Sequence, residues 1–331
     1  MNRVRFAIVI LAALLCLGSC GGKEWRKYEG ATWGTTFHIT YFSEYNLDDS
    51  IIATMRGVEL SLSPFDKESL VSRLNRGEDA VCDSLFLTVY AGAREIWVAS
   101  GGAFDPTVAP AVNLWGFGYK NSGIEPSQSD IDRIKGLVDF GKIELSGLNL
   151  IRPSGVELDF SAITKGYGCD MVAEMLQRNG CSDYMVEIGG EIALAGKNNR
   201  GENWHIMVDA PVENNESVVH DRMAVIELTE CGLATSGNYR NYRETSSGKV
   251  WHTIDPRTCR PAVSRTLSAT VIAENAMFAD ALATACMVLP ADSAIAMIEK
   301  MKGASAMLVL ENDSIGDCWK TIVSKDFPVL R

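Results

Sequence analysis

Positive charge is scarce in this sequence. Its 331 residues include 31 Lys and Arg against 42 Asp and Glu, which gives a formal net charge of −11. Nucleic-acid binding depends on clustered Lys and Arg, so nucleic acid is excluded as the main partner. None of the nine cysteines forms a Cys-x-x-Cys pair and no histidine has zinc-ligand spacing, which argues against a zinc module. The Gly-x-Gly-x-x-Gly and Walker A patterns are missing too, so any nucleotide would bind without the common fingerprints.

What remains is a globular composition. The chain is 47% hydrophobic and 22% charged, with 29 Gly and 10 Pro, which excludes disordered, collagen-like and coiled-coil classes. The length allows about two domains or one large domain. No Pro- or Ser-rich linker follows Gly22, and we therefore expect one compact unit.

The N-terminus has the pattern of a targeting segment. Two arginines precede an apolar run over residues 6–17, which is shorter than the roughly 20 residues of a membrane span. The run ends in Leu17-Gly18-Ser19-Cys20, which is similar to the lipobox of bacterial lipoproteins. We predict a signal peptide over 1–19, a lipid (palmitate) on Cys20, a tether over 20–29 and a domain over 30–331. The protein would then be exported and anchored to a bacterial membrane, on the periplasmic side; an ordinary signal peptide with a chance cysteine is the alternative.

The other cysteines suggest no chemistry. Cys16 would leave with the signal peptide, and the seven beyond Cys20 are an odd number, so at least one is unpaired. Most lie in apolar runs, where a small buried side chain is the simplest interpretation. Pairing in an oxidising compartment stays open.

Helical and strand patterns are interleaved without a repeat. Helices are predicted over 50–60, 85–100 (capped by Asp83-Ser84), 127–138, 164–179, 275–289 and 292–301. Strands are predicted over 36–42, 156–160, 184–188, 191–195, 204–209, 223–228, 250–254, 268–273 and 306–310, with a hairpin over 142–152. Hairpin-spaced strands with few helices favour an α+β fold with mixed, largely antiparallel sheets and flanking helices over a doubly wound one.

Four glycine-containing segments are candidates for ligand contact. Glycine lets the backbone approach a ligand closely, and neighbouring aromatic rings can stack on a planar group. Each segment alone also fits a turn between strands. The segments are 101–107, 113–118, 187–191 and 235–239.

Asp280 and Thr284 are a candidate metal pair. They lie four residues apart in a predicted helix, so their oxygens share one face. A carboxylate and a hydroxyl suit a hard cation such as Mg²⁺. The alternative is a surface Asp and a Thr bonded back to its helix. The neighbouring residues are almost all apolar, and an unpaired Asp there would be costly.

Two further segments contain candidate polar groups. Asp159 ends a predicted strand, and Lys165 lies in the first turn of the next helix, where a cation opposes the helix dipole and could serve an anion. His252, near Asp255 at a strand end, could act as a general base. A solvated lysine and a structural histidine are the alternatives.

Taken in order, eight segments resemble the ApbE family of FAD:protein FMN transferases, and they cover about residues 30 to 290. Members are commonly exported bacterial lipoproteins. The matching stretches are 33–35, 62–65, 102–107 with 113–118, 158–167, 188–190, 235–237, 252–256 and 279–284.

The resemblance implies a single α+β domain and the following sites. Mg²⁺ would be held by Asp280, Thr284 and the backbone carbonyl of Ala162. His252 is the candidate base, with Asp255 as the alternative. FAD would contact Trp33, Phe65, Ala103, Phe104, Asp105, Asp159, Lys165, His252 and Ile254.

The implied activity moves FMN from FAD to a threonine hydroxyl of another protein and releases AMP. Typical acceptors are subunits of sodium-pumping quinone reductase and Rnf-type electron-transfer complexes. Hydrolysis of FAD to FMN and AMP is an alternative, as is a non-catalytic flavin-binding lipoprotein. Three residues depart from the family pattern. This chain has Trp33 where the family usually has Met, Trp251 in place of the first of two histidines, and Cys259 where the family usually has Gly.

Overall fold

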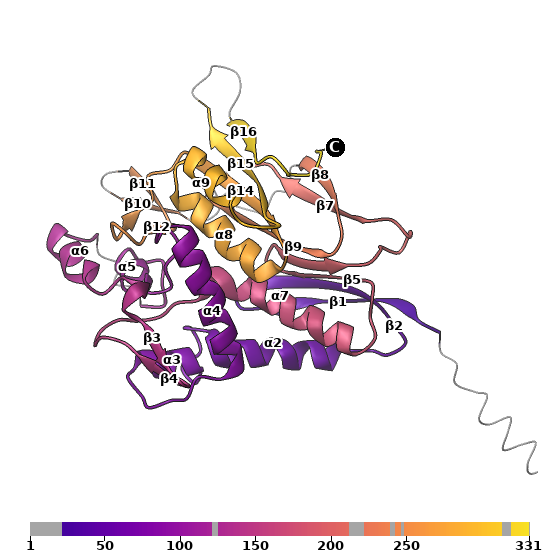
Figure 1. Cartoon of the computed structure of the whole chain (residues 1–331), viewed down its shortest axis with the longest axis horizontal. Helices are drawn as coiled ribbons and strands as arrows, with labels where there is room; N and C mark the ends of the chain where they lie inside the picture. Colours follow the sequence, from indigo (N-terminus) through magenta and orange to yellow (C-terminus); the bar gives the residue numbers. More distant parts are fainter. Residues whose placement is uncertain are drawn as a thin grey trace, which may run out of the picture.

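The computed structural model describes residues 22–120, 125–211, 222–238, 242–245, 248–312 and 319–330. Its largest element is an eight-stranded sheet in which all neighbouring strands are antiparallel (Figure 1). This confirms the predicted α+β class. In spatial order the strands are β1 (Glu24–Thr32), β2 (Thr35–Ser43), β5 (Tyr184–Ile188), β6 (Glu191–Ala195), β9 (Cys231–Gly237), β14 (Thr266–Ala273), β15 (Ser305–Glu311) and β16 (Trp319–Val323).

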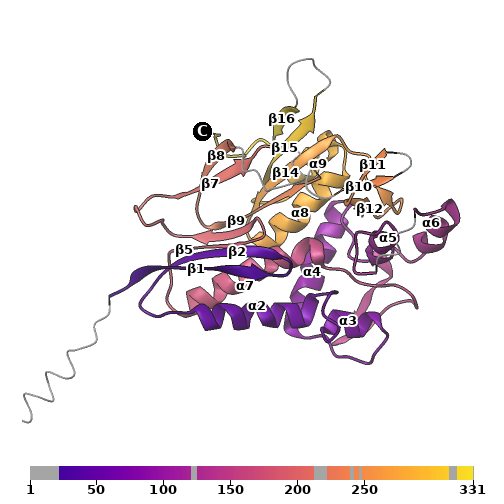
Figure 2. The same ribbon diagram turned by 180° about the vertical axis from the view of Figure 1, so that it is seen from behind.

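Helices cover one face of this sheet. Helix α7 (Ser161–Arg178) contacts β5 and β6, and α8 (Ala276–Val288) contacts β9 and β14 (Figure 2). Helices α2 (Asp48–Leu62) and α4 (Ser84–Ala99) pack against α7 and α8. Protein therefore surrounds α8, which explains why eleven of its thirteen residues are buried and why its sequence is apolar on all sides.

A strand pair covers the other face. Strands β7 (Trp204–Asp209) and β8 (Arg222–Leu228) are antiparallel to each other. Ile206 and Val208 of β7 belong to the same apolar cluster as Ile192, Leu233 and Ile272 of the main sheet. The alternation of side chains along a strand thus gives β6 one face toward the helices and one toward this pair.

Smaller elements complete the chain. No helix among the described residues has the length and apolar character to span a membrane. The remaining elements are α3 (Leu70–Asn75), α5 (Ala109–Leu114), α6 (Gln128–Lys135), a short 3₁₀ helix (Phe140–Lys142), the hairpin β3 (Glu144–Ser146) and β4 (Asn149–Ile151), the pairs β10 (Tyr242–Thr245) with β11 (Gly248–Trp251) and β12 (Ile254–Asp255) with β13 (Arg260–Pro261), and α9 (Ala291–Ile298).

Two strand predictions differ from the structure: 250–254 is divided between β11 and β12, and 156–160 is wrong. Residues 156–160 have no strand partner and are irregular. The side-chain amide of Asn75 takes the place of a partner, because it donates to the Leu158 carbonyl at 2.8 Å and accepts from the Leu158 N–H at 2.7 Å. The Asp159 N–H donates to the Pro106 carbonyl at 2.7 Å. The segment satisfies its backbone groups without a sheet, which its apolar pattern does not reveal.

The predicted boundary at the N-terminus also needs correction. The tether was predicted over 20–29, but Glu24–Thr32 pairs along its whole length with β2. β1 is an edge strand with few buried side chains, so its sequence lacks the apolar alternation of a strand. Residues 1–21, with the predicted signal peptide and Cys20, lie outside the described residues.

The described cysteines are free thiols. Cys82, Cys169, Cys181, Cys259 and Cys286 are buried, and Cys231 is partly buried. Cys259 adopts φ +57°, in the left-handed region that favours glycine. The resemblance implies glycine at this position, and here the chain adopts the same left-handed turn while placing a side chain in the adjoining apolar cluster.

Candidate functional site

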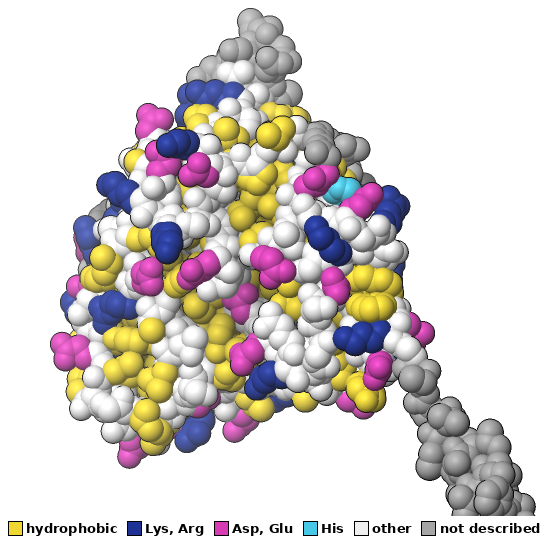
Figure 3. All heavy atoms as spheres, turned by 45° about the vertical axis from the view of Figure 1, so that its right-hand side comes forward, with side chains coloured by type: hydrophobic (Ala, Val, Ile, Leu, Met, Phe, Trp, Pro, Cys, Tyr) yellow, Lys and Arg dark blue, Asp and Glu magenta, His cyan; other side chains and the backbone are white. Residues whose placement is uncertain are grey.

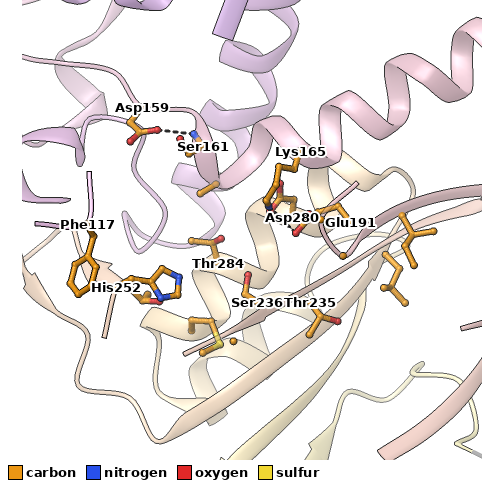
Figure 4. Close-up of a pocket in the computed structure, with 18 of the residues that line it drawn as sticks. Phe117, Asp159, Ser161, Lys165, Glu191, Thr235, Ser236, His252, Asp280 and Thr284 are labelled. Atoms are coloured by element: carbon orange, nitrogen blue, oxygen red, sulfur yellow. Dashed lines mark hydrogen bonds and ion pairs between the residues drawn. The ribbon is translucent and has the colours of Figure 1, made fainter. Parts of the chain in front are cut away.

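A cavity of about 660 Å³ opens beside the ends of β6 and β9, between α7 and α8 on one side and β7 on the other (Figure 4). It contains most of the residues that the sequence singled out. Those lining it are Phe65, Asp159, Ala162, Lys165, His252, Ile254, Asp280 and Thr284. On the face shown in Figure 3, Lys and Arg side chains lie scattered among Asp and Glu rather than gathered in one patch.

Asp280 is one of two fully buried carboxylates that line this cavity. Its side chain is 3% exposed, and Oδ2 accepts a hydrogen bond from the Gly166 N–H at 3.1 Å. The contact is close because Gly166 lacks a side chain: a Cβ there would lie 2.1 Å from the Ala276 carbonyl oxygen. Thr284, one turn further along α8, and Ala162, in the first turn of α7, line the same cavity.

These three groups fit a hard cation that also binds substrate. No group of three or more His, Cys, Asp and Glu side chains suited to a metal occurs in the part of the chain that the structure describes. The predicted set has one carboxylate, one hydroxyl and one carbonyl. Such a set is typical of Mg²⁺ bound by one or two carboxylates together with phosphate oxygens.

Lys165 and Glu191 lie beside Asp280. The Lys165 ammonium Nζ is 2.9 Å from Glu191 Oε1 and 3.7 Å from Asp280 Oδ1. Figure 4 shows the three side chains pointing toward one another. Burial raises the pKa of both carboxyls, and the Lys165 charge opposes that rise. Burial disfavours the ammonium, but Asp280 and Glu191 together raise the pKa of Lys165, so it stays charged.

The sequence indicated Glu191 only as the last residue of the glycine-containing segment 187–191, with no role for its carboxylate. It opens a strand whose five residues are all buried, immediately after Gly189-Gly190. A carboxylate in a buried strand is a signal that it has a partner. The residues of β7 that line the cavity, from Ile206 to Asp209, were missed as well, because the pairing that brings them there is not visible in their own sequence.

Asp159 and His252 line the cavity from two loops. Asp159 accepts from the Ser161 N–H at 2.8 Å, and burial raises the pKa of its carboxyl. The ring of His252 lies 6.4 Å from that of Phe117, edge to face. Asp280 and Thr284 line the same cavity, and Figure 4 shows the four side chains around it.

Asp255 does not line the cavity. Its two carboxylate oxygens each accept from Arg257 at 2.9 Å, and its carbonyl accepts from the Cys259 N–H at 2.8 Å. The carboxylate therefore holds a turn, which leaves His252 as the candidate base that faces the cavity.

Four residues predicted to contact FAD also lie away from the cavity lining. Ala103 and Phe104 are core residues. The Asp105 carboxylate accepts from Trp97 Nε1 at 3.0 Å, from the Phe140 N–H at 2.9 Å and from the Thr107 N–H at 2.7 Å. Trp33 adopts φ +50°, and its indole occupies the space where a Cβ of Gly168 would be. In this structure these side chains hold the fold together around the cavity.

Comparison with known proteins identifies the protein family that this chain matches. The model of the ApbE family matches residues 33–308. Curated relatives named FAD:protein FMN transferase are 35% identical in Vibrio cholerae, covering 92% of this chain and 94% of the relative, and 34% identical in Haemophilus influenzae, covering 95% of each.

Solved structures agree with these relatives. The flavin transferase ApbE from Vibrio cholerae has a TM-score of 0.81 and 32% identity, covering 92% of this chain and 99% of that one. The apo form of the Pseudomonas stutzeri flavinyl transferase ApbE has a TM-score of 0.81 and 29% identity, covering 93% and 96%.

Proposed function

This chain belongs to the ApbE family, and on that premise we propose that it transfers FMN from FAD to a threonine hydroxyl of an acceptor protein, releasing AMP. The observation that supports this most is the meeting of Ala162, Asp280 and Thr284 at one cavity beside Lys165. One carboxylate with a hydroxyl and a carbonyl leaves coordination positions that phosphate oxygens and waters can fill.

The proposed reaction is a phosphoryl transfer. The threonine oxygen forms a bond to the phosphorus on the FMN side, and the bond from that phosphorus to the bridging oxygen breaks. AMP leaves with the bridging oxygen, and the hydroxyl proton passes to an imidazole nitrogen of His252. Mg²⁺ held by Ala162, Asp280 and Thr284 would neutralise charge that develops on the pyrophosphate.

Other groups of the chain bind and orient. The Lys165 ammonium contributes a fixed positive charge beside the proposed cation site. The rings of Phe65 and Phe117 line the cavity and offer apolar surfaces to a planar flavin or adenine ring. The 660 Å³ volume lies within the range of ligand pockets.

We also propose how the enzyme is placed. The lipobox-like segment supports export, removal of residues 1–19 and lipid attachment at Cys20, on the periplasmic side of a bacterial membrane. An anchored enzyme would meet acceptors in the same membrane system, such as subunits of sodium-pumping quinone reductase or Rnf-type complexes.

One experiment separates the candidate activities. The protein is incubated with FAD, Mg²⁺ and an acceptor subunit, and AMP and the mass of the acceptor are followed. Transfer predicts equal amounts of AMP and of acceptor bearing FMN, with neither mass gain nor excess AMP when the acceptor threonine is replaced by valine. AMP without a mass gain would indicate a hydrolase, and bound FAD without AMP would indicate a binding protein.

A further inference from the structure

Three charged side chains from three elements meet at the end of the cavity nearest α8. Lys165 comes from α7, Glu191 from β6 and Asp280 from α8. The two carboxylates are 4% and 3% exposed, whereas the lysine is 32% exposed. The trio sets two acidic side chains against one ammonium, so it is not a closed one-to-one ion pair.

The proposed cation creates a conflict in this trio. Asp280 is the carboxylate assigned to the divalent cation, yet its Oδ1 also lies 3.7 Å from the Lys165 ammonium. Two positive charges at one buried carboxylate repel each other strongly, because water screens them poorly there. The ammonium therefore needs another anionic partner when the cation binds.

Glu191 offers that partner. Its Oε1 is already the nearer acceptor, at 2.9 Å from Nζ. Its Oε2 is buried and has no hydrogen-bond partner in the described part of the chain, which is a costly state for a carboxylate oxygen. An ammonium has three donors and can use both oxygens of one carboxylate.

We infer that Glu191 is a positioning residue that takes the Lys165 ammonium away from Asp280 when a divalent cation occupies Asp280. The inference rests on the proposed function, because it presupposes the cation site. Lys165 then keeps its charge in the cavity without competing for the metal, and the unpartnered Oε2 gains a donor.

The test measures Mg²⁺ binding alone, by calorimetry on the full chain without FAD or acceptor. Glu191→Gln leaves Asp280 as the only anionic partner of Lys165 in the trio, and the Mg²⁺ dissociation constant should rise about tenfold or more. Glu191→Gln combined with Lys165→Met removes the competitor and should return the constant to within about threefold of the wild-type value. Lys165→Met alone should not weaken Mg²⁺ binding.

Glu187→Gln is the matched control. Glu187 also lines the cavity, but its carboxylate pairs with His38 at 2.6 Å and accepts from the Gly190 N–H, away from Lys165. Glu187→Gln removes the same charge as Glu191→Gln, but it should change the Mg²⁺ dissociation constant by less than about threefold. Thermal unfolding checks that each variant folds. If Glu191→Gln is unfolded, Glu191→Asp should show a smaller weakening that Lys165→Met again reverses.

Several results would overturn the inference. Mg²⁺ binding unchanged in Glu191→Gln would do so, as would a double variant that binds as weakly as the single one, since Glu191 would then act as a direct ligand. An equal weakening in Glu187→Gln would also overturn it, since Glu191 would then act only as a general negative charge. No Mg²⁺ binding by the wild type would also overturn it. The proposed function fails separately: normal Mg²⁺ binding with the expected variant pattern, but no AMP or modified acceptor, would refute transfer and leave the role of Glu191 standing.

Discussion

At the residue scale, the proposed metal site depends on the Asp280 carboxylate. Asp280→Asn keeps an oxygen to accept from the Gly166 N–H but removes the charge that a divalent cation requires. We expect AMP release at moderate Mg²⁺ to fall at least about 100-fold, since metal assistance is worth several kcal/mol. Asp292→Asn, on the exposed side of α9, should have no effect. Full activity of Asp280→Asn at saturating Mg²⁺ would contradict the assignment of the metal.

His252 and Asp255 are distinguished by what they contact. His252 faces the cavity, whereas the Asp255 carboxylate is bound to Arg257. His252→Ala should lower the rate of transfer by about 100-fold, as loss of a general base does, and leave the FAD dissociation constant within about threefold. Asp255→Asn should lower the melting temperature but change the rate of transfer much less than His252→Ala does. A fast His252→Ala enzyme and a slow, stable Asp255→Asn enzyme would exchange the two roles.

Asp170 gives a pH-dependent contribution to stability. Its carboxylate accepts from the Ala276 and Met277 N–H groups, each at 2.8 Å, at the start of α8, but burial raises its pKa to about 7. The unfolded chain releases this proton near pH 4, so the folded state binds more protons between about pH 4 and 7. The contribution of Asp170 to the free energy of unfolding therefore decreases as pH rises through this range.

Asp170→Asn isolates that contribution. The asparagine does not titrate, so the difference in unfolding free energy between wild type and variant should shift against the wild type from pH 5 to pH 8. Urea unfolding at several pH values measures it. Parallel curves for the two proteins would show that Asp170 titrates at an ordinary pKa in the folded state.

At the element scale, the site depends on how closely α7 approaches α8. A Cβ at position 166 would lie 2.1 Å from the Ala276 carbonyl oxygen and 2.9 Å from Asp280 Cβ. Gly166→Ala must therefore push the helices apart, with an expected loss of about 1–3 kcal/mol in unfolding free energy and weaker Mg²⁺ binding.

Gly57→Ala in α2 is the control for this substitution. A Cβ at Gly57 meets nothing within 4 Å, so alanine should stabilise the protein by about 0.4–1 kcal/mol through the unfolded state. Mg²⁺ binding should not change. If Gly166→Ala behaves like Gly57→Ala, then the close packing of α7 on α8 is not what positions Asp280.

The same elements show what the sequence could predict. Helix α8 was located to within one residue at each end, because an apolar run is bounded by the Asn275 cap and Pro290. The Asp83 cap of α4 and the hairpin over 142–152 were also predictable from local patterns. The strand over 156–160 was wrong because its backbone partner is a distant side chain, that of Asn75.

The site was predictable only where the information is local. The spacing of Asp280 and Thr284 is visible within one helix, Lys165 was a candidate from its place in the next predicted helix, and the family resemblance added Ala162. Glu191 reaches Lys165 through the packing of β6 on α7, and β7, paired with β8, reaches the cavity through its packing on the main sheet. Such contacts join segments far apart in the chain and leave no periodic pattern in either of them.

At the scale of the whole molecule, the charge of the chain favours the proposed cation. Removal of residues 1–19 would leave 312 residues with a formal charge of −13. The phosphates of FAD are anionic as well, and an acidic protein repels them at long range. Lys165 is paired with its carboxylate neighbours, so the proposed divalent cation would be the group that makes the cavity attractive to a pyrophosphate.

The whole-molecule prediction concerns the anchor at Cys20. Strand β1 begins at Glu24, so only residues 21–23 separate the proposed lipid from the fold, and the enzyme would be held close to the membrane. Cys20→Ala should move the protein from the membrane fraction to the soluble fraction. Its rate on a soluble acceptor fragment should stay within about twofold, because the anchor forms no part of the cavity. Ser19→Ala, which keeps the lipid-bearing cysteine, should remain membrane-bound.

Cells carrying Cys20→Ala should modify a membrane-embedded acceptor more slowly, because anchoring to the same membrane raises the effective concentration of the two proteins. A Cys20→Ala protein that stays in the membrane fraction, or that loses activity in solution, would contradict a lipid anchor separate from the catalytic domain.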